Sequence, residues 1–156
     1  MMPDGSYRMS QAQAAEAVNK PPVNALRFLS SKAIKALLGE EYTDYTPDSI
    51  EVDSPGQGRG QTRINALPLE VVTAFWVAQC SQGNKSAIAL VMALATETLD
   101  RRFDDAFGVT RSAAEYNQSL SQRMSQFEAE LSALADAYAE PDILREQVLR
   151  LEDQLR

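Results

Sequence analysis

The chain has 156 residues, 44% of them apolar and 24% charged, a composition typical of a soluble globular domain with an appendage. Histidine is absent, which excludes imidazole base catalysis, histidine metal sites and Ser-His or Cys-His pairs, so we expect no enzyme, no cofactor and no metal site. No uncharged apolar stretch reaches the 18 residues of a membrane span, and the single cysteine, Cys80, fits a reducing cytoplasm.

The net charge of −7 is unevenly distributed along the chain. Residues 1–39 carry five basic side chains against two acidic ones, whereas residues 40–55 carry six acidic side chains and no basic one. The sign of the local charge, more than the total, decides which surface can approach phosphate. The N-terminal part is therefore the better suited to nucleic acid.

Two helices are predicted near the N-terminus. Ser10 is a good N-cap for a helix over Gln11–Val18, and consecutive prolines in Asn19–Pro22 end that helix. A second helix is expected from about Val23 to Leu38, closing on Gly39, although Ser30-Ser31 can split it. A short helix, a four-residue break and a longer helix indicate a helix-turn-helix, but any two short helices in a helical domain give the same pattern.

The helical wheel of the second helix separates two faces. Its leucine side holds Leu26, Leu29, Ala33 and Leu37, its polar side holds Asn24, Arg27, Ser31 and Lys35, and Phe28 lies at the edge of the polar side. Side chains of these polar types pair with base edges and phosphates, and an aromatic edge can meet a thymine methyl group. The alternative is a solvated face whose phenylalanine packs under a neighbouring loop.

A β-hairpin is predicted after an acidic stretch, Glu40–Asp53. Residues Ser49–Asp53 alternate between polar and apolar, Gln61–Asn65 form the return strand, and the intervening tip is rich in glycine. The tip is not a nucleotide-binding P-loop, because it lacks Lys-Ser/Thr and a following helix. It is either a wing that contacts a DNA backbone or a plain loop. The candidate DNA-binding residues are Lys20, Asn24, Arg27, Phe28, Ser31, Lys35, Arg59 and Arg63.

A helical hairpin is predicted over Leu67–Gly108, with Gly83 and Asn84 at the corner. Apolar side chains recur at helical spacing in both helices, so we expect this hairpin to form a wall of the core. The expected inner residues are Val72, Phe75, Trp76 and Gln79 in the first helix, and Ile88, Val91, Met92, Ala95, Leu99 and Phe103 in the second. Acidic residues near Asp104 alternate with arginines, which indicates a salt-linked surface more than a cation site.

Three segments together resemble a known family. The segment Tyr7–Ala12 is similar to the start of the KilA-N and Bro-N type domains of phage and large-virus DNA-binding proteins. Arg27-Phe28-Leu29, with Lys32 and the Leu37–Gly39 end, resembles their central helix, and Thr62–Leu69 followed by Phe75-Trp76 resembles the strand before their paired helices. The resemblance covers about residues 7–107 and implies an α+β DNA-binding domain of antirepressors and related regulators. The acidic Glu40–Asp53 insert departs from the pattern.

A coiled-coil helix is predicted after a hinge at Val109–Ser112. Its heptad seam breaks at Pro141 and restarts in another register. The expected oligomerisation residues are Leu120, Met124, Phe127, Leu131, Leu134, Tyr138, Leu144, Val148, Leu151 and Leu155. A lone helix with one apolar stripe needs a partner. Self-association is the favoured partner, and folding back onto the preceding domain is the alternative.

The sequence as a whole predicts a mostly helical α+β protein: a helix-turn-helix-like head with a β-hairpin wing, a helical-hairpin core and a C-terminal coil. We expect a winged DNA-binding domain over residues 1–108 and an oligomerisation segment over residues 109–156. The predicted function is a cytoplasmic, sequence-specific regulator that binds double-stranded DNA as a homodimer or higher homo-oligomer, without a membrane. The alternative is an antirepressor-like adaptor that binds another regulator and not DNA.

Overall fold

The structure is a computed structural model that describes residues 2, 4–52 and 62–154, with the backbone alone at 52, 62, 138–148 and 152–154. The chain is α+β and mostly helical. It divides into two compact units, Met1–Val91 and Met92–Arg156. The division falls inside helix α5 (Lys85–Phe107), whereas the sequence analysis placed the domain boundary at Gly108.

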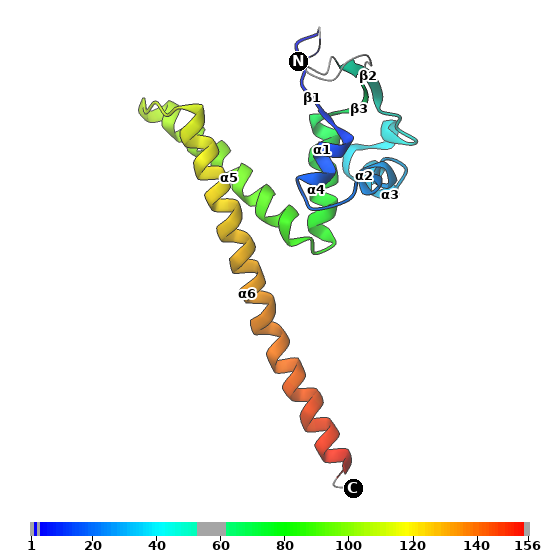
Figure 1. The fold of residues 1–156 in the computed structure, drawn as a ribbon, viewed down its shortest axis with the longest axis vertical. Helices are drawn as coiled ribbons and strands as arrows, with labels where there is room; N and C mark the ends of the chain where they lie inside the picture. The colour runs from blue at the N-terminus through cyan, green and yellow to red at the C-terminus, as the bar shows by residue number, and fades with distance from the viewer. Residues whose placement is uncertain (1, 3, 53–61, 155–156) are drawn as a thin grey trace. The chain divides into compact units, whose positions relative to one another are not determined.

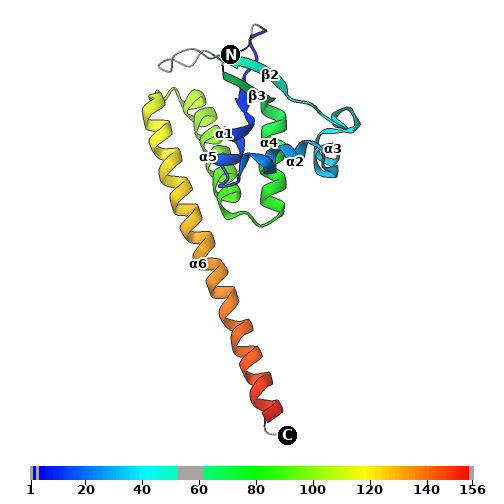
Figure 2. The same ribbon diagram turned by 45° about the vertical axis from the view of Figure 1, so that its right-hand side comes forward.

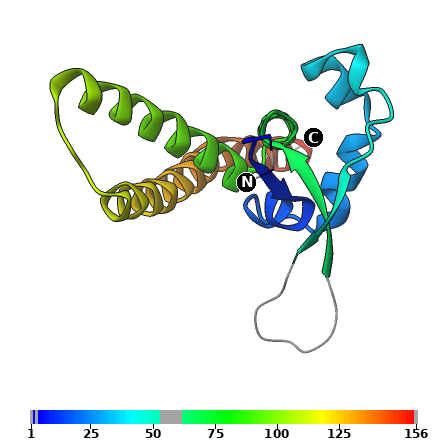
Figure 3. The ribbon, with the colours of Figure 1, turned by 90° about the horizontal axis from the view of Figure 1, so that it is seen from above.

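The first unit contains a three-stranded antiparallel sheet (Figure 3). Strand β3 (Thr62–Pro68) lies in the middle, with β1 (Arg8–Ser10) on one side and β2 (Asp48–Val52) on the other. Ile50 pairs with Ile64 across β2 and β3, so the predicted hairpin is confirmed. The residues of its tip, Arg59 among them, lie outside the described part of the chain.

Four short helical segments connect β1 to β2: α1 (Gln11–Glu16), α2 (Pro22–Leu29), α3 (Lys32–Leu38) and the 3-10 helix η1 (Glu40–Tyr42). Helix α1 begins at Ser10, as predicted. The Ser10 hydroxyl accepts the backbone N–H of Gln13, and the Gln13 side chain accepts the backbone N–H of Ser10, which is a capping box.

The second predicted helix is split into α2 and α3 at Ser30-Ser31. The Ser31 hydroxyl accepts the backbone N–H of Ala33 and donates to the carbonyl of Phe28, so one side chain ends α2 and caps α3. A helical wheel drawn through both segments therefore assigns their faces wrongly. The buried residues are Ala25, Phe28 and Leu29 in α2 and Ile34 in α3, whereas Leu26 and Leu37 are exposed.

Helix α4 (Leu69–Ser81) is the central element of the first unit. Its buried residues are Val71, Val72, Ala74, Phe75, Trp76, Ala78 and Gln79, which confirms the predicted inner face. The Trp76 indole N–H donates to the carbonyl of Ala14 in α1 at 2.8 Å. The Phe75 ring lies 5.6 Å from the Phe28 ring of α2 in a tilted arrangement. Helix α4 thus holds α1 and α2 in place through aromatic contacts.

The corner between α4 and α5 also contacts α1. Gly83 has a φ of 77°, which is accessible to glycine at little cost, and the Asn84 side chain caps α5 by accepting the backbone N–H of Ala87. The Asn84 amide donates to the carbonyl of Val18 at 2.8 Å. Asn19, at a φ of 55°, donates to the Ser86 hydroxyl. The segment between α1 and α2 is therefore attached to the start of α5.

The second unit is a pair of antiparallel helices, the C-terminal part of α5 and the long helix α6 (Ala113–Gln154) (Figures 1 and 2). Helix α6 continues through Pro141 without a break. The predicted inner face of α5 is wrong at Met92, Ala95, Leu99 and Phe103, which are exposed. Ile88 and Val91 are half-buried, and the buried residues are Ala87, Ala89, Leu90 and Ala93. Three of these four buried residues are alanines.

Replacement of Trp76 tests the core of the first unit. Trp76→Ala should lower the free energy of unfolding by about 3–5 kcal/mol, because it opens a cavity and leaves the carbonyl of Ala14 without its donor. Val77→Ala, on the exposed side of the same helix, should cost less than about 1 kcal/mol. Urea unfolding followed by circular dichroism measures both. Equal small effects would show that Trp76 is not a core residue.

Candidate nucleic-acid interface

The exposed face of α2 is the part of the first unit best suited to contact a partner. Its members are Val23, Leu26, Arg27 and Ser30, and the opposite side of the helix is buried against α4. The face combines one guanidinium, one hydroxyl and two aliphatic side chains. Guanidinium and hydroxyl groups pair with base edges and phosphates, and aliphatic groups meet thymine methyls.

Two of the predicted contact residues serve the fold instead. Phe28 is only 6% exposed and packs against Phe75, so it is a core residue and not a contact residue. Ser31 is half-buried and uses its hydroxyl to cap α3. Ser31 was misplaced because the wheel assumed one continuous helix, and Phe28 because the ring that covers it, Phe75, lies on a distant element.

Helix α2 is positioned by a buried glutamine. The Gln11 side chain, 9% exposed, donates to the carbonyl of Pro22 at the start of α2 and accepts from the Asn65 amide on β3, at 3.1 and 3.2 Å. Pro22 occupies the first turn of α2, where its missing N–H costs nothing. One side chain therefore joins α1, α2 and the hairpin strand, so that the exposed face of α2 and the hairpin have a set geometry within this unit.

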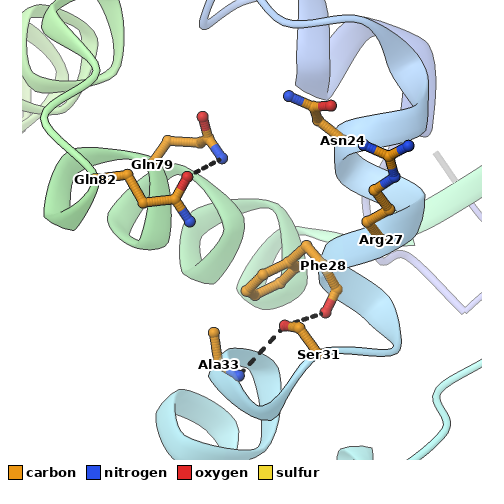
Figure 4. A pocket seen from close by; sticks show the side chains of 7 residues that line it. All are labelled: Asn24, Arg27, Phe28, Ser31, Ala33, Gln79 and Gln82. Atoms are coloured by element: carbon orange, nitrogen blue, oxygen red, sulfur yellow. Dashed lines mark hydrogen bonds between the residues drawn. The ribbon is translucent and has the colours of Figure 1, made fainter.

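A shallow hollow of about 310 Å³ adjoins this face, between α2, the start of α3 and the C-terminal end of α4 (Figure 4). Asn24 and Arg27 line it from α2, and Gln79 and Gln82 line it from α4. The buried Gln79 amide accepts a hydrogen bond from Asn84 at 3.2 Å, and its N–H group reaches Gln82 only at 3.5 Å. The hollow is thus bordered by amides and one cation.

The predicted basic residues differ in their partners. Lys35 forms an ion pair with Glu40, and Arg63 donates two hydrogen bonds of 3.1 Å to the Glu51 carboxylate across β2 and β3. Arg27 and Lys20 have no ion pair within the described part of the chain. Exposed ion pairs of this kind contribute at most about 1 kcal/mol, so a phosphate can compete for Arg63.

Sequence reasoning missed several residues of this surface. Val23, Leu26 and Ser30 belong to it, and Gln79 and Gln82 border its hollow. The helical wheel itself carried the signal for the first three, because Val23, Leu26 and Ser30 fall on the same side of the helix as Arg27. Nothing in the sequence pointed to the two glutamines, since they reach the hollow from a different helix.

The described residues that could serve catalysis or metal binding are the Cys80 thiol and the acidic side chains of α5. Burial raises the pKa of the Cys80 thiol, so it remains protonated and a poor nucleophile near neutral pH. Glu97 pairs with Arg101 as predicted, whereas Asp104 is buried and pairs with Arg111 beyond the end of α5, so it is not part of a solvated face. No group of three potential metal ligands occurs among residues 2, 4–52 and 62–154, and within those ranges no helix has the length and apolar character to cross a bilayer.

Comparisons with protein-family models, with curated proteins and with solved structures return no match for this chain.

Two adjacent residues of α2 should separate the core from the surface. Phe28→Ala should destabilise the protein by about 3–5 kcal/mol, because it removes a ring packed on Phe75. Arg27→Ala should change stability by no more than about 0.5 kcal/mol, since Arg27 is exposed. Thermal and urea unfolding provide the measurement. A stable Phe28→Ala variant would contradict the burial of this side chain.

Proposed function

We propose that the protein is a sequence-specific regulator that binds double-stranded DNA, with α2 as the helix that enters the major groove. The observation that carries the proposal is the exposed face of α2, which presents Arg27 among aliphatic and hydroxyl side chains while the rest of the helix is buried. A rigid helix with one anchored side can hold a side chain at a base edge.

The order of elements supports the proposal. Helix α1, a turn of residues 17–21 and helix α2 follow the order of a helix-turn-helix, in which the second helix reads the groove, with a turn one residue longer than the three or four usual for that motif. The turn is held by Asn84 and Asn19, so the start of α2 is well fixed. Clustered basic residues in the first 39 positions favour the approach to phosphate despite the acidic total.

The β2–β3 hairpin supplies a backbone contact in this proposal. Arg63 lies on β3, and Gln11 links that strand to the start of α2. A guanidinium on an exposed strand can exchange its Glu51 partner for a phosphate, which adds affinity without sequence preference. Arg63 is thus proposed to position the protein, and Arg27 to read the sequence.

Helix α6 is proposed to contribute to self-association. Leu120, Met124, Phe127 and Leu131 are half-buried in the single chain, and Leu120 and Phe127 share a face with Tyr116 and Arg123, which contact α5. The expected seam therefore begins as an intramolecular contact. Leu134 and Leu151 are exposed. The side chains of Tyr138, Leu144 and Val148, and all of Leu155, lie outside the described part. The proposed intermolecular seam starts at Leu134.

An adaptor that binds another protein is the second candidate. An apolar hollow of about 340 Å³ lies between α3 and α4 and is lined by Leu37, Leu38 and Val77, with Glu70 at its border. Leu37 and Val77 are exposed there. An exposed aliphatic hollow can receive the apolar side of a partner helix. This hollow is the surface through which an adaptor would bind its partner. It becomes the leading site if the protein does not bind DNA.

Electrophoretic mobility shifts with a selected and a scrambled duplex test the two roles. Arg27→Ala should cost roughly 1–3 kcal/mol on the selected duplex and much less on the scrambled one. Arg63→Gln should weaken binding to both duplexes equally. It should also reduce the slope of log affinity against log salt concentration by about one unit.

The same experiment decides between the two candidates. The control is Lys85→Gln, which removes a charge from an exposed position at the start of α5. It should leave the preference for the selected duplex over the scrambled one unchanged. Equal losses on both duplexes for Arg27→Ala would make α2 a backbone contact. No binding of the unmutated protein at low salt would favour the adaptor.

The role of α6 is tested at Leu134. Leu134→Asp places a charge on the proposed seam and should weaken self-association at least about tenfold. Ala133→Asp introduces the same charge at an exposed position beside the seam and should leave self-association unchanged. Sedimentation equilibrium at several concentrations gives the association constants. Identical constants for the two variants would exclude the seam as a contact.

A further inference from the structure

Hydrogen bonds and ion pairs join α5 to α6 and to the segment between them in the second unit. The Asp104 carboxylate accepts the Tyr116 hydroxyl at 2.8 Å and pairs with the Arg111 guanidinium at 3.1 Å. Asp100 pairs with Arg123 of α6 at 2.7 Å. Tyr116 and Arg123 of α6 are thus tied to Asp104 and Asp100 of α5 by a hydrogen bond and an ion pair, and one buried nitrogen of Arg123, Nη1, has no partner.

The outer face of α5 is apolar instead. Leu99, Phe103 and Phe107 are spaced by four residues and form one row along the helix, which we call the α5 ridge. Their exposed fractions are 54%, 61% and 78%. A contiguous exposed row of large apolar side chains marks an interaction site, so the ridge is a candidate contact surface.

The exposed area is of the size that an interface core requires. With 150–250 Å² for a whole aromatic side chain, the two phenylalanines alone leave on the order of 300 Å² per chain in water. Leu99, and Met92 seven residues earlier, extend the same face. A standard interface buries about 800 Å² per partner, of which the apolar core is a part. The ridge can therefore supply the core of one interface.

We propose that the α5 ridge binds the α5 ridge of a second copy of this chain, antiparallel, about a two-fold axis at Phe103. The ridge is symmetric in position about Phe103, because Leu99 and Phe107 each lie four residues away. An antiparallel two-fold axis therefore places Phe103 against its own copy and Leu99 against Phe107 of the second copy, a smaller side chain opposite a larger one. Such self-complementarity is what an isologous contact requires.

This contact is separate from the seam proposed on α6, and it does not depend on whether the first unit binds DNA. The residues of the ridge are exposed and make no hydrogen bond or ion pair, so their replacement leaves the polar contacts between α5 and α6 in place. A test on the ridge therefore reports on self-association and not on folding.

Single-cysteine variants in a Cys80→Ala background test the register of the contact. Phe103→Cys should form a disulfide-linked dimer by itself under mild oxidation. Leu99→Cys and Phe107→Cys should link poorly alone, because in the antiparallel contact each lies eight helical residues, about 12 Å along the axis, from the same residue of the second copy. The two variants should link well when they are mixed. Non-reducing gel electrophoresis, with one variant carrying a size tag, identifies the mixed dimer.

The controls use the opposite side of α5. Thr98→Cys and Asp105→Cys are equally exposed, and neither should link, alone or mixed. Strong self-linking of Leu99→Cys and Phe107→Cys without a mixed product would mean a parallel contact and would overturn the proposal. Absence of linking at Phe103 would also overturn it and would leave the ridge to a different partner.

A variant without engineered thiols gives an independent measurement. Phe103→Gln should weaken self-association at least about tenfold, as expected for a central aromatic anchor, while its circular dichroism spectrum stays unchanged. Thr98→Gln is the matched control. An unchanged association constant for Phe103→Gln would refute the ridge contact even if cysteine variants happened to link.

Discussion

The packing of α4 against α1, fixed by the hydrogen bond from Trp76 to the carbonyl of Ala14, is the interaction on which the first unit depends. Helix α4 is buried on most of its circumference, so the other elements must surround it. The indole has room there because Ala14 and Ala15 of α1 are small, and both are fully buried. An indole placed there gains both a large apolar contact and a satisfied N–H group.

The position of α2 follows from that packing. Phe28 packs on Phe75 of α4, and Gln11 and Asn84 hold the two ends of the connection from α1. Because these contacts involve the inner side of α2, the side chains on its outer side are not needed for the packing of the unit. The outer side of α2 is therefore available for the groove-binding role proposed for Arg27.

The second unit distributes its chemistry in the opposite way. Asp104, Tyr116 and Arg111 form a hydrogen-bonded cluster between the helices, whereas the α5 ridge lies on the surface. The buried pair of Asp104 and Tyr116 specifies how α5 and α6 align, because either group would be costly to leave unpaired. Apolar side chains that take no part in this alignment are left available for association between chains.

The sequence by itself determined those features that depend on neighbouring residues. Ser10 and Asn84 as caps, Gly83 at the corner and the alternation in β2 were all predicted, because each is satisfied by hydrogen bonds or conformations a few residues away. The inner face of α4 was predicted as well, since bulky side chains recur there at one helical spacing.

Only the tertiary structure decided which faces of α2 and α5 are buried. The burial of Phe28 required both the Ser31 cap that splits the predicted helix and Phe75, which lies 47 positions further along the chain. The exposure of the α5 ridge required α6 to approach the polar side of α5 through Tyr116 and Arg123. Apolar periodicity identifies a helix, but it cannot choose between two possible inner faces. That choice depends on the partner that distant sequence provides.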